Sequence, residues 1–244
     1  MPLLAIFIDD GGVMNDNSKR GEQWMDLVAQ YFVPRYGGEP KTWREANHQV
    51  LEILIDELET RINESQNLDY GKHQALEDEI WINHMFDTVG VDRPPEQEYF
   101  RICREAENWV TPQVNAAIDG IIPAIKKLKS EGFQLYTASG ETSWTLHGYL
   151  LGMGLLDCFI TLYGPDLLGM MKGGDQYYKE MFVHAQVDPS HALVIDDNPK
   201  MLQLANQLGA FTIQSCVLEG TKPGWKHYYT SPGELSKSIE RITT

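Results

Sequence analysis

The sequence predicts an α/β protein, a doubly wound parallel sheet that carries an inserted α-helical cap domain. Three apolar runs, residues 3–8, 133–138 and 192–195, are each followed directly by small polar or acidic residues. Helical patterns separate the second run from the third, and strands that alternate with helices are typical of a parallel sheet covered on both faces. A long helical block directly after the first run breaks this alternation, which indicates an insertion.

The apolar runs have the length and composition of buried strands. The first, Leu3 to Ile8, contains no polar residue and stops at Asp9-Asp10. Continuous apolar runs of this kind are typical of central parallel strands, which are buried on both faces. The other strands are expected at residues 133–138, 159–163, 192–195 and 211–213.

The helical patterns fall into two groups. Helices of the α/β part are expected at residues 116–130, 143–151, 176–185 and 200–208, with a last one that a capping box opens at Ser231 and that runs to Ile242. Helices of the insertion are expected at residues 21–35, 42–63, 71–89 and 95–110, with proline and glycine between them. We therefore predict a discontinuous core of residues 1–15 and 112–244, and a helical cap of residues 16–111.

The charge and the cysteine content exclude several classes of function. The chain has 35 acidic and 20 basic side chains, a formal charge of −15. Nucleic acids and anionic lipids are bound by clusters of Lys and Arg, so we expect neither as a partner. The first apolar run is too short to cross a bilayer, and it lacks the basic start of a signal peptide. Three widely spaced cysteines without a CxxC pair favour a reducing compartment, so we expect a cytoplasmic protein.

Reactive side chains lie at four places along the α/β part: Asp9, Ser139, Lys172 and the pair Asp196-Asp197. The carboxyl ends of parallel strands share one edge of the sheet, so residues far apart in the sequence converge there. A carboxylate, a hydroxyl, an ammonium and a carboxylate pair suit phosphoryl transfer, in which an aspartate attacks phosphorus and forms an aspartyl-phosphate. Oxygen ligands favour Mg²⁺, which reduces the repulsion between the two anions.

This ordered set resembles the four motifs of the haloacid dehalogenase-like hydrolases. The matching segments are residues 7–14, residues 135–140, Lys172 with Tyr177-Tyr178, and residues 193–198. The resemblance covers residues 1–15 and about 112–244, and the helical block lies where the first type of cap of that family belongs. It implies a Rossmann-like core with a helical cap, and hydrolysis of a small phosphorylated metabolite.

The resemblance also implies a role for each residue. Asp9 is the expected nucleophile, and Ser139 and Lys172 are expected to hold the transferring phosphoryl group. The expected Mg²⁺ ligands are Asp9, the main-chain oxygen of Gly11, Asp196 and Asp197. The residues expected around the substrate are Asp10, Gly11, Ser139, Gly140 and Lys172.

Gly11 departs from the pattern of the family. Most of its phosphatases carry a second aspartate at this position, which protonates the leaving group and then activates water. Asp10 does not replace it simply, because neighbours on an extended backbone point to opposite sides. A missing acid matters least when the leaving group is a weak base, so we expect a bias toward acyl, aryl or sugar 1-phosphates.

Each of these residues also has a simpler interpretation. Asp9, Ser139 and the pair Asp196-Asp197 can cap the turns or helices that follow them, and Lys172 can be a solvated surface lysine. The occurrence of all four motifs in order favours the functional interpretation. For Lys19 and Arg20, which lie between the first motif and the insertion, a solvated linker charge is the expectation, ahead of a contact with an anionic substrate.

The function expected from the sequence is a Mg²⁺-dependent phosphatase. The first alternative is a 2-haloacid dehalogenase. It explains Gly11, because a halide leaves without a proton. It uses no metal, however, so the like charges of Asp196, Asp197 and Asp9 would repel one another without compensation. A phosphomutase fits less well, because it needs the missing acid. The non-enzymatic alternative is a degenerate member that serves as a binding module. The identity of the substrate and the oligomeric state stay open.

Overall fold

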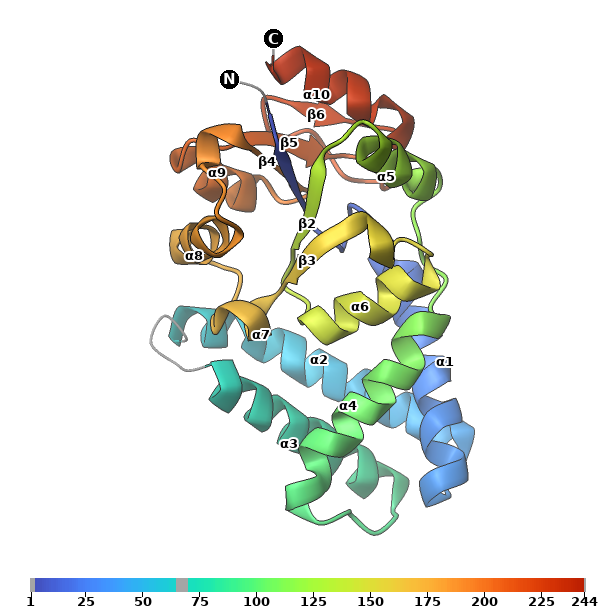
Figure 1. Cartoon of the computed structure of the whole chain (residues 1–244). Helices are drawn as coiled ribbons and strands as arrows, with labels where there is room; N and C mark the ends of the chain where they lie inside the picture. Colours follow the sequence, from blue (N-terminus) through green and yellow to red (C-terminus); the bar gives the residue numbers. More distant parts are fainter. Residues whose placement is uncertain (1–2, 65–69, 244) are drawn as a thin grey trace.

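The computed structural model of the chain describes residues 3–64 and 70–243. At its centre is a sheet of six parallel strands in the order β3-β2-β1-β4-β5-β6 (Figure 1). The strands are β1 (Ala5–Ile8), β2 (Gln134–Ala138), β3 (Phe159–Tyr163), β4 (Ala192–Asp196), β5 (Phe211–Ser215) and β6 (Tyr228–Tyr229). The predicted parallel α/β sheet is confirmed, with β6 as a short edge strand that the sequence did not indicate.

Strand β1 lies in the middle of the sheet, paired with β2 on one side and with β4 on the other. All of its residues are fully buried, as expected for an uninterrupted apolar run. Ile8 lies opposite Thr137 of β2 and Ile195 of β4. The three strands therefore end at nearly the same level, and the residues that follow them emerge together at one edge of the sheet.

Helices cover both faces of the sheet. They are α5 (Ile121–Ser130), α6 (Ser143–Gly152), α7 (Pro165–Leu168), α8 (Asp175–Ala185), α9 (Pro199–Gln207) and α10 (Leu235–Thr243). Ile6 and Ile8 pack on the side of α5 and α10, whereas Ala5 and Phe7 pack on the side of α8 and α9, because successive side chains of a strand point to opposite faces. None of the helices in the described ranges combines the length and the apolarity needed to cross a membrane.

The insertion after β1 consists of α1 (Asn17–Tyr36), α2 (Pro40–Glu64), α3 (Tyr70–Val89) and α4 (Tyr99–Val110). These helices form a layer beyond the carboxyl edge of the sheet (Figure 1). Their apolar core centres on Phe32, which stacks on Trp43 at 4.9 Å and meets the rings of Trp81 and Phe86 edge-on at 5.6 and 6.0 Å. The division into a core of residues 1–15 and 112–244 and a cap of residues 16–111 stays a prediction; residues 1–2, 65–69 and 244 lie outside the described part.

Two local predictions differ from the structure. The helix expected from residue 116 begins only at Ile121. The preceding Gly120 adopts a left-handed conformation with φ +86°, which a right-handed helix cannot include. Residues 116–118 instead pair with the segment that follows β1, since the amide of Ile118 donates to the oxygen of Met14 at 2.9 Å and the amide of Asp16 donates to the oxygen of Ala116 at 2.9 Å. The capping box expected at Ser231 does not form: its side chain makes no capping hydrogen bond, and a 3-10 turn (Pro232–Glu234) precedes α10.

Candidate active site

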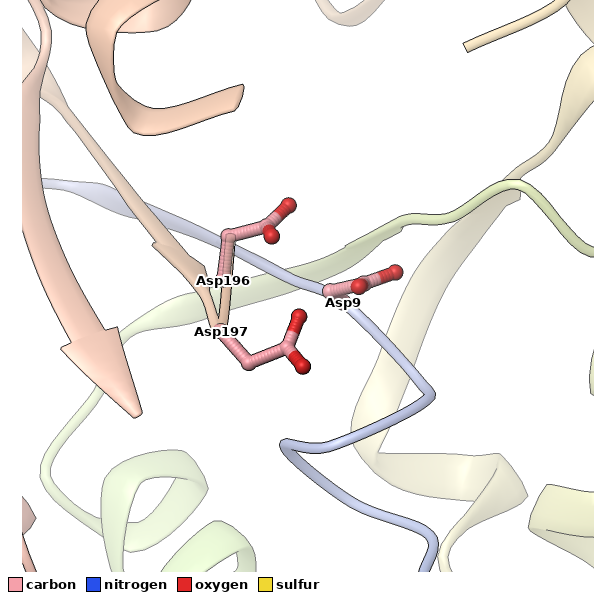
Figure 2. A group of neighbouring side chains, drawn as sticks. All are labelled: Asp9, Asp196 and Asp197. Carbon is pink, nitrogen blue, oxygen red and sulfur yellow. The ribbon is translucent and has the colours of Figure 1, made fainter. Parts of the chain in front are cut away.

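Three carboxylates converge where β1 and β4 end. Asp9 follows β1, Asp196 is the last residue of β4, and Asp197 comes next (Figure 2). Each of them offers an oxygen, and these oxygens lie within 4.8 Å of one another. The pairing of the strands creates this proximity, since the main-chain amide of Asp9 donates to the oxygen of Ile195 at 2.9 Å. The structure thus brings the first and the fourth motif together.

Lys172 joins this cluster from the loop between α7 and α8. Its side chain is 6% exposed, and its Nζ lies 3.0 Å from Asp9 Oδ1 and 2.7 Å from Asp196 Oδ2. Burial disfavours the ammonium, but the charges of Asp196 and Asp9 outweigh burial and raise the pKa of Lys172 well above its ordinary value. A solvated surface lysine is therefore the wrong interpretation of this residue.

The charge of the cluster is incompletely balanced by protein groups. Burial, opposed by Lys172 and reinforced by Asp9, raises the pKa of Asp196 to about 7. Burial and the nearby Asp9 also raise the pKa of Asp197. The three carboxylates outnumber the one ammonium by two charges, which a divalent cation would balance. An all-oxygen donor set of this kind fits Mg²⁺.

Two glycines allow the chain to pass close to these carboxylates. Gly12 has φ +73°, and a Cβ on it would overlap the carboxylate of Asp197. A Cβ on Gly11 would lie 2.7 Å from Oδ1 of Asn17, the first residue of α1. The main chain at Gly12 thus packs directly against the side chain of Asp197, and the side chain of Asn17 packs against Gly11.

The carboxylate of Asp10 turns away from the cluster. It is fully buried, accepts a hydrogen bond from Asn15 Nδ2 at 2.8 Å and pairs with Arg20 Nη1 at 2.5 Å. Burial, which outweighs the charge of Arg20, raises the pKa of Asp10 to about 6. The side chain of Asp10 is therefore occupied by protein partners, and the predicted contact of this residue with the substrate stays a prediction.

Arg20 has a structural role that the sequence did not indicate. Its side chain is 15% exposed and also reaches Glu141 Oε1 at 3.1 Å, so it joins the segment after β1 to the segment after β2. The expectation of a solvated linker charge is wrong for Arg20. In the sequence nothing distinguishes it from its neighbour Lys19, because the partners of Arg20 are brought to it by the fold.

Ser139 lies at the end of β2, the other neighbour of β1. Its main chain is held on both sides: its amide donates to the oxygen of Tyr163 at 3.1 Å, and Tyr177 Oη donates to its carbonyl at 2.9 Å. Its Oγ accepts from the amide of Glu141 at 3.1 Å, which leaves the hydroxyl hydrogen to donate elsewhere. Gly140 follows with open space around its Cα. Ser139 and Gly140 share the sheet edge with Asp9, and their substrate contacts stay predictions.

Other residues cap the helices that follow these motifs. The caps are Asp16 for α1, Thr142 for α6 and Asn198 for α9, each through a side-chain oxygen that accepts from the first turn. The candidate residues therefore do not cap these helices, although Ser139 Oγ and Asp196 Oδ1 each accept from the amide two residues on, at 3.1 and 2.8 Å.

Comparison with protein families agrees with this geometry. A family model described as haloacid dehalogenase-like hydrolase matches residues 45–214, more than half of the chain. The chain belongs to the haloacid dehalogenase-like hydrolases. The match includes Ser139, Lys172 and the pair Asp196-Asp197, whereas Asp9 precedes it. The comparison with curated proteins finds no match.

Solved structures of haloacid dehalogenase-like proteins share the fold over nearly their whole length. The L-2-haloacid dehalogenase of Xanthobacter autotrophicus is 14% identical, with 98% of both chains covered and a TM-score of 0.62. CbbY of Rhodobacter sphaeroides, in complex with phosphate, is 15% identical, with 98% of this chain and 99% of that chain covered and a TM-score of 0.59. The hydrolase YfnB of Bacillus subtilis, bound to magnesium, is 17% identical, with 97% and 98% covered and a TM-score of 0.58. Identities this low establish a common fold and leave the reaction open.

Proposed function

We propose that this hydrolase is a Mg²⁺-dependent phosphatase that acts on a small phosphorylated metabolite through an aspartyl-phosphate on Asp9. The observation that carries the proposal is the cluster of Asp9, Asp196 and Asp197, whose oxygens lie within 4.8 Å of one another with Lys172 as their cation. The excess of two negative charges, which includes the nucleophile Asp9, suits a divalent cation, and such a cation would reduce the repulsion between Asp9 and a phosphate dianion. Asp9, the main-chain oxygen of Gly11, Asp196 and Asp197 would hold Mg²⁺, which when bound offsets the charge of the phosphoryl oxygens.

The residues of the chain then divide the work of the reaction. A carboxylate oxygen of Asp9 attacks phosphorus, and the bond between phosphorus and the leaving oxygen breaks. Lys172 is placed to pair with a non-bridging oxygen, and Ser139 has a free hydroxyl hydrogen at the same sheet edge. Water then attacks the phosphorus of the aspartyl-phosphate and releases inorganic phosphate. We expect the main chain of Asp10 and of Gly140 to line the substrate.

A 2-haloacid dehalogenase is the second candidate, and Gly11 is the observation that favours it. In that reaction the leaving halide takes no proton, so no acid is needed two residues after Asp9. The acidic cluster speaks against it, because Asp196 and Asp197 would repel a haloacid carboxylate in the absence of a metal. A phosphatase explains both the cluster and Lys172, and it therefore ranks first.

The charge and the thiols of the chain support a proposal for its cellular setting. Cys103, Cys158 and Cys216 are all free in the structure, as is usual in a reducing compartment, and we place the protein in the cytoplasm. The formal charge of −15 argues against nucleic acid or a membrane surface as partners, whereas a small anionic substrate needs only local positive charge such as that of Lys172.

A panel of phosphorylated metabolites, assayed for phosphate release with Mg²⁺ and with EDTA, tests the proposal. Wild type is compared with Asp9→Asn and with Asp119→Asn, which removes an exposed carboxylate elsewhere. We expect release that requires Mg²⁺, that Asp9→Asn abolishes and that Asp119→Asn leaves unchanged. Halide release from 2-haloacids in EDTA would instead establish the dehalogenase, and no turnover in either assay would favour a binding module.

A further inference from the structure

The side chain of Asn17 covers Gly11. A Cβ atom on Gly11 would lie 2.7 Å from Asn17 Oδ1, 2.9 Å from Nδ2 and 3.2 Å from Cγ. The amide therefore fills the space that a side chain of residue 11 would take, two residues after Asp9. Asn17 is exposed, and within residues 3–64 and 70–243 its amide has no hydrogen-bond partner. The amide is thus free to contact a ligand.

The chain around Asn17 is held firmly. The main-chain oxygen of Asp10 accepts hydrogen bonds from the amides four and five residues on, at 2.8 and 2.9 Å, so the chain folds back on itself after Asp9. The carboxylate of Asp16 caps α1, and Arg20 in the next turn pairs with Asp10 at 2.5 Å. These contacts fix the first residue of the helix over Gly11, which makes its position a property of the fold.

We propose that the side-chain amide of Asn17 binds the leaving-group oxygen of the substrate, in the place of the missing carboxyl group of residue 11. The inference rests on the proposed phosphatase function and narrows it. An amide N–H donates a hydrogen bond but does not transfer a proton at neutral pH. The group that departs must therefore leave as an anion, so the substrates are esters of weakly basic alcohols, acids or phenols.

The chemical step balances without an acid from the protein. A bond forms between an oxygen of Asp9 and phosphorus, and the electron pair of the breaking phosphorus–oxygen bond passes to the leaving oxygen. The N–H of Asn17 stabilises this anion, which takes its proton from water after it departs. Acyl phosphates, aryl phosphates and sugar 1-phosphates meet this requirement, whereas simple alkyl phosphates do not.

Aryl phosphates that range from 4-nitrophenyl to phenyl phosphate test the inference through kcat and KM at saturating Mg²⁺. We expect Asn17→Ala to lower kcat/KM about ten- to a hundredfold on every ester, since one hydrogen bond to an anion is lost. Asn17→Asp supplies a carboxyl group, and it should raise the phenyl to 4-nitrophenyl ratio of kcat/KM at least tenfold at low pH. Ser18→Ala, the next exposed residue of α1, is the matched control and should behave as wild type.

The outcomes separate this inference from the proposed function. Phosphate release by wild type combined with an Asn17→Ala variant as active as Ser18→Ala would overturn the inference alone. So would an unchanged leaving-group ratio in Asn17→Asp. Absence of Mg²⁺-dependent phosphate release from every ester in wild type would overturn both. Because this amide bonds to none of the residues that the structure describes, thermal unfolding of Asn17→Ala should stay within about 2 °C of wild type, which excludes misfolding as the cause of lost activity.

Discussion

Replacement of Lys172 by Met should destabilise the protein strongly when no divalent cation is present. Its Nζ bonds two buried carboxylates, Asp9 at 3.0 Å and Asp196 at 2.7 Å. Removal of one partner from a buried ion pair costs about 3–5 kcal/mol. For a chain of this size each kcal/mol lowers Tm by about 2–4 °C. The structure therefore predicts that Lys172→Met lowers Tm by about 6–20 °C in EDTA at pH 8.

The loss should shrink at lower pH. Asp196 has a pKa of about 7, raised by burial, so at pH 5 it is mostly protonated and no longer needs the ammonium. The matched control is Lys179→Met, which removes an exposed lysine paired with Asp175 at 2.5 Å, a contact that solvent screens and that therefore adds little to stability. Thermal unfolding followed by circular dichroism in EDTA at pH 5 and pH 8 measures both variants. Equal Tm values for the two variants, or a loss for Lys172→Met that does not depend on pH, would refute the reasoning.

Two further predictions concern Gly12, whose main chain contacts Asp197, and Glu107 of the insertion. In Gly12→Ala the new Cβ would overlap the carboxylate of Asp197, and the left-handed φ of residue 12 would add about 1–2 kcal/mol of backbone strain. We therefore expect calorimetry to show at least tenfold weaker Mg²⁺ binding for this variant. The control Gly21→Ala, at a helical glycine with open space around it, should bind Mg²⁺ as wild type does. Unaltered affinity in Gly12→Ala would contradict the role of this close approach. Burial raises the pKa of Glu107 to about 8, although the charge of Arg104 opposes this shift. The folded state therefore favours the protonated carboxyl group, and the free energy of unfolding falls as the pH rises from about 4.5 to 8. Glu107→Gln should flatten the decline of Tm over this range, and parallel curves for the variant and wild type would disprove the assignment.

The architecture follows from the sequence because burial of a central parallel strand leaves a clear signal. The run that became β1 is apolar throughout, and its end at Asp9 places that residue at the carboxyl edge. Once β1 and β4 are neighbours, the meeting of Asp9 with Asp196 and Asp197 requires no further information. Lys172 was also predicted for the cluster, although only its place in the motif order indicated it.

The residues that the sequence missed act through contacts that only the folded loop creates. Arg20 and Lys19 are adjacent and equally basic, yet Arg20 is buried against Asp10 and Glu141 whereas Lys19 is exposed. The position of Asn17 over Gly11 depends on the turn that precedes α1, and this turn has no periodic pattern to read. The charge of a residue is visible in a sequence, but its partners are set by the path of the backbone.

The covalent intermediate provides the most direct test of the account. Wild type and Asp9→Asn are mixed with a substrate labelled at its phosphoryl group, quenched in acid within milliseconds, and digested for mass spectrometry. We expect a phosphoryl group on the peptide that contains Asp9, formed only with Mg²⁺ and absent from Asp9→Asn. Phosphate release without a labelled Asp9 peptide, or release that persists in Asp9→Asn, would contradict it.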